Sequence, residues 1–146
     1  MPILKNNTAL LTILLIVVQL GLCIVVIMTR QYVSTHWNIY GIVDEYGSPF
    51  YTLILPLISV LMYFFMTFFE KHPHYCNWPR EFKDRQKGYS LLAELVSRLK
   101  LLIVMFLTFV TYEVYCGGSF NYLIALLILI SSFIVLIVYA IRLRRV

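Results

Sequence analysis

His36, Asn38 and Asp44 are the residues of this sequence whose types and spacing could best do chemistry. An imidazole beside a carboxylate can share a proton, bind a ligand or, with further ligands, hold a divalent metal ion. Metal sites need three or four ligands at a recognisable spacing, which this segment does not supply. We predict no bound metal and no cofactor. We favour the hypothesis that His36 and Asp44 bond to the backbone of the loop and so hold its turn. A ligand or partner surface ranks second, and a metal site or catalysis ranks third.

Glu113 is the only acidic residue inside a stretch that is apolar enough to cross a membrane. A carboxylate in that position is costly and is by default a candidate functional group. We expect its helix to continue to about Ser119 and to bring Glu113 close to His36 and Asp44. The alternative is a helix that stops near Tyr112 and leaves Glu113 at the membrane interface.

The segment that carries His36, residues 29–50, is predicted to be a compact loop that is polar on one side. Its first half is rich in β-branched and aromatic residues, which favours a short extended strand. Gly41 and Gly47 mark turns on either side of Asp44. Alternation along a strand predicts two faces, one of Ser34, His36, Asn38 and Tyr40 and one of Val33, Thr35, Trp37 and Ile39.

The composition places these residues in a membrane protein. The chain has 146 residues, of which 61% are hydrophobic and 13% charged, with a mean hydropathy of +0.84. Soluble domains carry about 25% charged residues, so a soluble enzyme is disfavoured. Intrinsic disorder is disfavoured as well, because it needs low hydrophobicity. Four apolar stretches approach the ~20 residues that a helix needs to cross a bilayer. They predict an all-α domain of four transmembrane helices, residues 9–28, 51–69, 99–116 and 122–141, with a compact outer loop after the first.

The basic residues predict the orientation in the membrane. Apart from Arg30, every Lys and Arg lies before the first stretch, between residues 70 and 100, or after the fourth stretch. The positive-inside rule then places both termini and the loop 70–98 in the cytoplasm. The excess of basic residues therefore gives no reason to expect nucleic acid. Residues 88–98, with a Glu94–Arg98 pair and one leucine-rich face, predict a helix on the inner membrane surface or an extension of the third span.

The outer segment also resembles a known membrane family. Its pattern reads His36-Trp37-Asn38-x-x-Gly41-x-x-Asp44-x-x-Gly47, followed by Leu55-Pro56-Leu57, and Asn77-Trp78-Pro79 is similar to the family's Asn-Tyr-Pro. This bacterial integral-membrane family is known as domain of unknown function 1648, and its module also occurs in the immunity protein against sporulation-delaying toxin. The resemblance covers roughly residues 33–100 and implies a bacterial plasma-membrane location. It implies binding residues at His36, Asn38, Gly41, Asp44 and Gly47, with structural residues at Pro56, Asn77 and Pro79.

Two functions from different classes remain open. The first is a non-enzymatic sensor, immunity or interaction protein whose outer loop binds a toxin, another membrane protein or a second copy of the chain. The alternative is a membrane enzyme, or a subunit associated with ion movement or transport, that uses His36, Asp44 and Glu113 at the outer face. Bound metal, or pH-dependent activity lost in His36→Ala, would favour the alternative.

Overall fold

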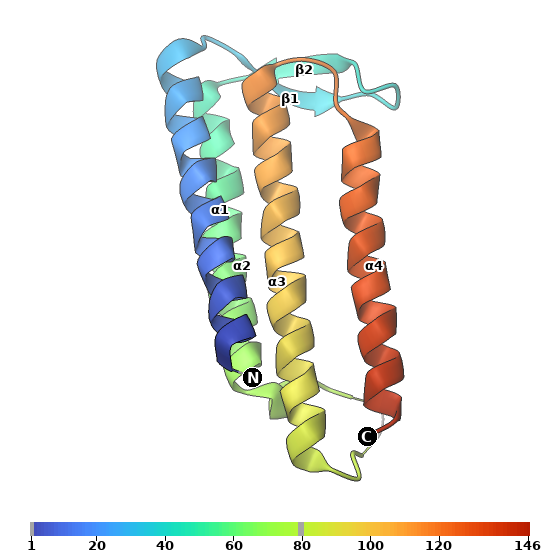
Figure 1. Ribbon diagram of the computed structural model, residues 1–146. Helices are drawn as coiled ribbons and strands as arrows, with labels where there is room; N and C mark the ends of the chain where they lie inside the picture. The colour runs from blue at the N-terminus through green and yellow to red at the C-terminus, as the bar shows by residue number, and fades with distance from the viewer. Residues whose placement is uncertain (1, 79–80) are drawn as a thin grey trace.

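The computed structural model describes residues 2–78 and 81–146, and this part of the chain is mostly helical (Figure 1). Short 3-10 helices, η1 (Pro49–Leu53) and η2 (Pro73–Tyr75), flank the second long helix. Two antiparallel strands, β1 (Val33–Trp37) and β2 (Val43–Gly47), form a hairpin across one end of the bundle, called here the hairpin end. The opposite, terminal end is where the first helix begins and the last one ends. The four long helices are α1 (Pro2–Thr29), α2 (Ile54–Lys71), α3 (Arg85–Cys116) and α4 (Tyr122–Arg144).

Among the described residues, three segments are long and apolar enough to cross a membrane, namely Asn7–Thr29, Pro49–Lys71 and Tyr122–Arg144, each of 23 residues. At ~1.5 Å per residue each is roughly 35 Å long, which exceeds the ~30 Å hydrocarbon core of a bilayer. The chain is therefore a helical membrane protein, as its composition predicts. Helix α3 is not one of these three. It includes residues 85–98, so the amphipathic segment extends the third helix, which is the second of the two predicted arrangements.

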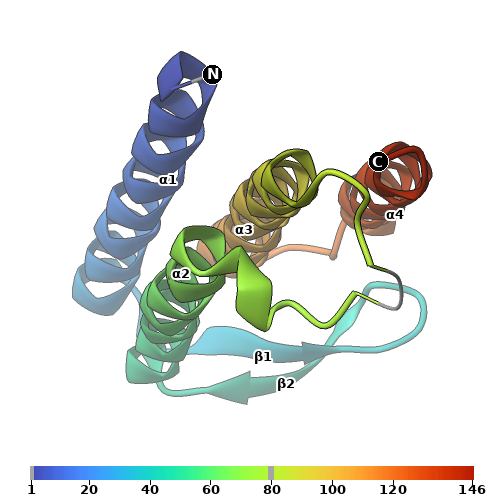
Figure 2. The same ribbon diagram turned by 90° about the horizontal axis from the view of Figure 1, so that it is seen from below.

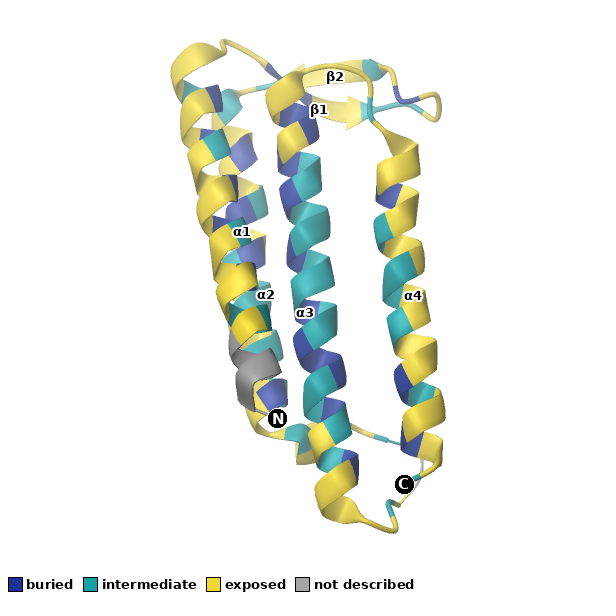
Figure 3. Cartoon of the chain, viewed as in Figure 1, coloured by how far each residue is buried: buried dark blue, intermediate teal, exposed yellow. Residues whose placement is uncertain are grey.

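Helix α3 is the centre of the bundle, with α1 and α2 on one side and α4 on the other (Figure 2). The outward surfaces of α1, α2 and α4 are exposed and apolar, whereas α3 is mainly buried or half-buried (Figure 3). The buried positions of α1 recur at alternating intervals of four and three residues, the spacing of a helix seam. They are Thr12, Ile16, Gln19, Cys23 and Val26.

Local sequence explains where the helices begin and end. The Asp84 carboxylate accepts a hydrogen bond from the Lys87 amide at 3.0 Å and caps α3, and Gly117 ends it in the left-handed conformation with φ 67°. Asn121 caps α4 through the Ile124 amide, so a short turn makes α3 and α4 antiparallel neighbours. Pro56 is buried in the first turn of α2, where its missing N–H costs no internal hydrogen bond.

Candidate functional site

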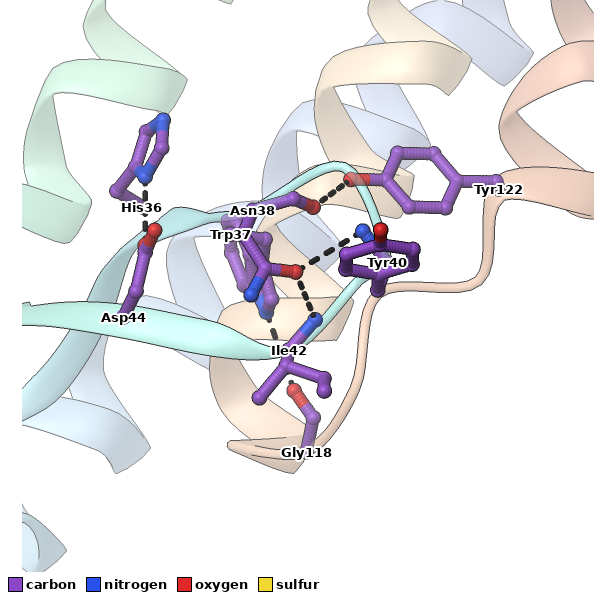
Figure 4. A network of polar contacts seen from close by, with 8 residues as sticks. All are labelled: His36, Trp37, Asn38, Tyr40, Ile42, Asp44, Gly118 and Tyr122. Carbon is purple, nitrogen blue, oxygen red and sulfur yellow. Dashed lines mark hydrogen bonds and ion pairs between the residues drawn. The ribbon is translucent and has the colours of Figure 1, made fainter.

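The turn of the hairpin is built by Asn38 and Gly41. The Asn38 side-chain oxygen accepts hydrogen bonds from the amides of Tyr40 at 2.9 Å and Ile42 at 3.1 Å (Figure 4). Gly41 has φ 76°, a conformation that glycine adopts without strain. A Cβ at position 41 would also lie 2.8 Å from the Phe120 carbonyl oxygen. Both residues thus shape the hairpin and lie where it meets the α3–α4 turn.

Among the described residues, three hydrogen bonds fix the hairpin to the α3–α4 turn and the first residue of α4, and Figure 4 shows the two made by Tyr122 and Trp37. The Tyr122 hydroxyl donates to the Asn38 carbonyl at 2.5 Å, and the Trp37 indole N–H donates to the Gly118 carbonyl at 3.1 Å. The Phe120 amide donates to the Gly41 carbonyl at 2.8 Å. The Trp37 and Phe120 rings pack with centroids 5.2 Å apart. The hairpin is therefore held as a rigid cap across the bundle.

Gly47 allows close packing at the other end of the hairpin. A Cβ there would lie 2.7 Å from the Thr35 methyl group and 2.8 Å from the Tyr51 ring. Directly after it, the Ser48 hydroxyl accepts a hydrogen bond from the Phe50 amide and caps η1, which leads into α2. Gly47 thus joins β2 tightly to the start of α2.

His36 and Asp44 form an exposed ion pair across the two strands. The imidazole Nδ1 lies 2.6 Å from the Asp44 carboxylate, with side-chain exposures of 61% and 44%. Figure 4 places this pair away from the contacts of Asn38, Trp37 and Tyr122. The prediction that the two side chains hold the turn through its backbone is wrong: they bind each other, and Asn38 makes the backbone contacts.

The predicted alternation of faces along the first strand is also wrong. Val33 and Ser34 are both buried, and His36 pairs in register with Glu45 rather than Asp44. The register shifts on either side of His36, which marks an irregular, bulged strand. Such a bulge reorients side chains without lengthening the partner strand. The bulge explains why Ser34 is buried and His36 is exposed, although residues two positions apart on a regular strand lie on the same face.

Glu113 lies inside α3, which continues past it to Cys116, so the alternative of a stop near Tyr112 is wrong, and the helix ends three residues before the expected Ser119. Its side chain is buried, with the residue 6% exposed. Within the described residues, no hydrogen bond or ion pair joins its carboxylate to His36 or Asp44. The structure therefore pairs two of the three predicted groups and leaves Glu113 on the helix below them.

The second similarity to the family lies at the terminal end. Asn77 is exposed and lines a cavity of about 410 Å³ with His74 and Cys76, while Pro79 lies outside the described residues. In the described part of the chain no group of three His, Cys, Asp or Glu side chains could hold a metal ion. Burial raises the pKa of the Cys76 thiol, which favours the neutral form over a metal-binding thiolate.

A buried ion pair between α2 and α3 is the main feature that sequence reasoning missed. The Lys100 ammonium lies 2.7 Å from the Glu70 carboxylate and donates to the Thr67 hydroxyl at 3.0 Å. It also lies 4.8 Å from the centre of the Tyr63 ring. The Lys100 and Glu70 side chains are 1% and 5% exposed. The sequence did carry a signal for this pair. Glu70 directly follows the apolar stretch 51–69 and Lys100 lies at the start of the stretch 99–116, so the two opposite charges lie on either side of the same loop.

Comparison with protein-family models, curated proteins and solved structures gives no match for this chain. The fold and site define a helical membrane protein capped at one end by a docked β-hairpin. The family resemblance of residues 33–100 stays a prediction.

Proposed function

We propose that this chain is a non-enzymatic interaction protein of a bacterial plasma membrane, and that its hairpin binds a partner at the outer face. One observation carries the proposal. The hairpin is fixed through Trp37, Asn38 and Gly41, so its exposed His36–Asp44 pair stands on a rigid support and takes no part in these docking contacts. A preorganised exposed surface loses little conformational entropy on binding, which favours recognition.

The proposal includes four membrane crossings with both termini in the cytoplasm. Helix α3 runs alongside the three apolar helices for their whole length (Figure 1). In the part of the chain that the structure describes, the basic residues gather toward the terminal end, with Arg30 as the exception near the hairpin end. The positive-inside rule supports placing the terminal end in the cytoplasm and the hairpin outside.

The exposed side chains of the hairpin suggest the chemistry of its partner. Asp44 and Glu45 are exposed acidic groups, and Tyr40 and Tyr46 are 78% and 63% exposed. Arg30, the nearby cation, already donates to the Tyr115 carbonyl. Acidic and aromatic groups together suit a basic, partly apolar segment. A cationic membrane-active toxin, in line with the family resemblance, or a basic loop of another membrane protein would fit.

The partner can be tested by site-specific photo-crosslinking in cells. A crosslinking residue at Tyr46 should trap the toxin or membrane partner, and Asp44→Asn should weaken the adduct. A matched residue at Tyr75, which is 60% exposed at the terminal end, should not give that adduct. In a deletion strain, wild-type protein but not Asp44→Asn should restore protection. Bound metal, or pH-dependent activity lost in His36→Ala, would instead support the enzyme alternative.

The topology has a separate test by thiol labelling. Cys76 and Cys116 would be replaced by serine, and the buried Cys23 retained. A cysteine introduced at Glu45 should react with a membrane-impermeant reagent in intact cells, and one introduced at Arg144 should react only after lysis. Labelling of the Arg144 position in intact cells would contradict the proposed orientation.

A further inference from the structure

A cavity of about 410 Å³ lies beneath the hairpin and is independent of the exposed His36–Asp44 pair. Its roof is β1 and its walls are the start of α2 and the last turns of α3. Most of the lining is apolar, and the volume is in the range of ~300–1,000 Å³ typical of small-molecule sites. The lining residues used below are Ser34, Trp37, Tyr51, Ile54 and Val110.

Ser34 is the unusual residue of this cavity. It is 3% exposed, and its hydroxyl has no hydrogen-bond partner among the described residues. A buried hydroxyl without a partner costs free energy that a hydrogen-bonding ligand would recover. Of the other hydroxyl-bearing residues in the lining, Thr52 donates to the Pro49 carbonyl at 2.7 Å, and Thr35 and Tyr51 are exposed. The cavity thus has a mostly apolar lining, and its roof includes a buried serine whose hydroxyl is unpartnered among the described residues.

The position of the cavity indicates which molecule reaches it first. Tyr51 and Ile54, at the start of α2, are 58% and 52% exposed and continue the apolar surface of the membrane-crossing helix. The molecules at highest concentration beside such a surface are membrane lipids. Ser34 is on the hairpin side and the apolar walls extend toward the middle of the bundle, which matches a lipid with its ester groups near the interface and its chain deeper.

We propose that this cavity is a specific phospholipid site, in which an acyl chain occupies the space between α2 and α3 and the Ser34 hydroxyl donates to an ester carbonyl. Trp37 and Tyr51 form the interfacial rim of the site, as aromatic residues do at membrane surfaces. The proposal depends on membrane location alone and not on the partner of the hairpin. Its failure would leave the proposed function intact.

Trp37 provides a fluorescence reporter for the experiment. The second tryptophan, Trp78, packs against the core cluster that includes Leu95 and Leu143, and it would be replaced in a Trp78→Phe background. The full chain would be reconstituted in nanodiscs with increasing fractions of a phosphatidylcholine brominated in its acyl chain. We expect saturable quenching of Trp37 at low fractions of brominated lipid, on top of the gradual quenching by bulk lipid.

Three variants separate the site from general lipid contact. Ser34→Ala should weaken the saturable component roughly 2- to 10-fold, the effect of one hydrogen bond, and Val110→Phe should abolish it by filling the cavity. Ser132→Ala, which removes a hydroxyl bonded to the Ile128 carbonyl of α4, should leave it unchanged. Circular dichroism and thermal melting would confirm that each variant is folded.

Two results would overturn the proposal. One is quenching that rises only in proportion to brominated lipid and is the same in Ser34→Ala and Ser132→Ala. The other is displacement of the brominated lipid by decanol at concentrations where unbrominated phosphatidylcholine has no effect, which would assign the cavity to a small amphiphile. An ether-linked brominated lipid, which lacks the ester carbonyl, should bind the wild type no better than the ester lipid binds Ser34→Ala.

Discussion

The two ends of the bundle each carry an ion pair of nearly the same length in opposite surroundings. His36 and Asp44 approach to 2.6 Å in the hairpin, where both side chains are well exposed. Lys100 and Glu70 approach to 2.7 Å between α2 and α3, where both are almost fully buried. Water screens the first pair, whereas the second lies in a medium of low dielectric constant.

This difference assigns the two pairs different roles. An exposed pair contributes little to stability, so its groups are available to a partner at small cost. A buried pair has lost hydration on both groups, and each charge depends on its neighbours for compensation. The Thr67 hydroxyl and the Tyr63 ring add to that compensation around Lys100. The buried pair therefore fixes α2 against α3, while the exposed pair faces solvent.

The largest effect is expected for Lys100→Met. Removing one partner of a buried pair typically costs about 3–5 kcal/mol in the free energy of unfolding, because the other charge stays buried and loses an ion-pair partner. Thermal unfolding in detergent, followed by circular dichroism, would measure the loss. The exposed Lys71→Met is the matched control and should be close to wild type. Glu70→Gln combined with Lys100→Met should recover part of the stability. Equal melting temperatures of Lys100→Met and Lys71→Met would contradict a stabilising role of the buried pair.

The next largest effect is expected for Gly41→Ala. The alanine would have to adopt φ 76° and would approach the Phe120 carbonyl, at a cost of about 1–3 kcal/mol. We expect faster hydrogen exchange at the Ile42 amide and easier proteolysis of the hairpin. Gly21→Ala is the same change within α1, where no atom lies within 4 Å of the added Cβ. It should be neutral or stabilising, so similar losses at both positions would contradict the docking role of Gly41.

A smaller effect on stability is expected for His36→Gln. The exposed pair should contribute within about 1 kcal/mol, so the melting temperature should stay close to that of wild type. A partner adduct formed through Tyr46 should nevertheless weaken. A large loss of stability in His36→Gln would remove the contrast between the two ends.

The smallest effect concerns Glu94 at the terminal end. Burial raises its pKa, but the nearby Tyr139 hydroxyl and Arg98 guanidinium outweigh burial and hold the pKa below its ordinary 4.5. A lowered folded-state pKa stabilises the protein above pH 4.5, and this contribution is lost as the pH falls through the folded value. The stability difference between wild type and Glu94→Gln should therefore shrink below pH 4.5. A difference that is constant with pH would contradict this role.

Parts of this arrangement could be predicted from sequence and parts could not. The apolar stretches predict helices because every backbone group in lipid must be bonded locally, and the leucine face of residues 91–99 does pack against Tyr139 and Leu143 of α4. The bulge beside His36 shifts the register of the two strands, and a simple alternation of faces along a strand cannot predict such a shift. The Lys100–Glu70 pair joins residues 30 positions apart, and charges next to apolar stretches are normally assigned to solvated loops.

The long sequence separation of one other contact has a consequence for the order of assembly. The Gln19 side-chain amide in α1 donates to the Leu107 carbonyl and the Thr111 hydroxyl, which lie 88 and 92 residues further along the chain. At a synthesis rate of about 5–20 residues per second, roughly 4–18 s pass before these acceptors exist. During that interval the first helix carries an unpaired amide in lipid. Helix α1 can therefore contact η1 and α2 early, but it gains its contacts with α3 only after α3 has been synthesised, so the bundle is completed late in biosynthesis.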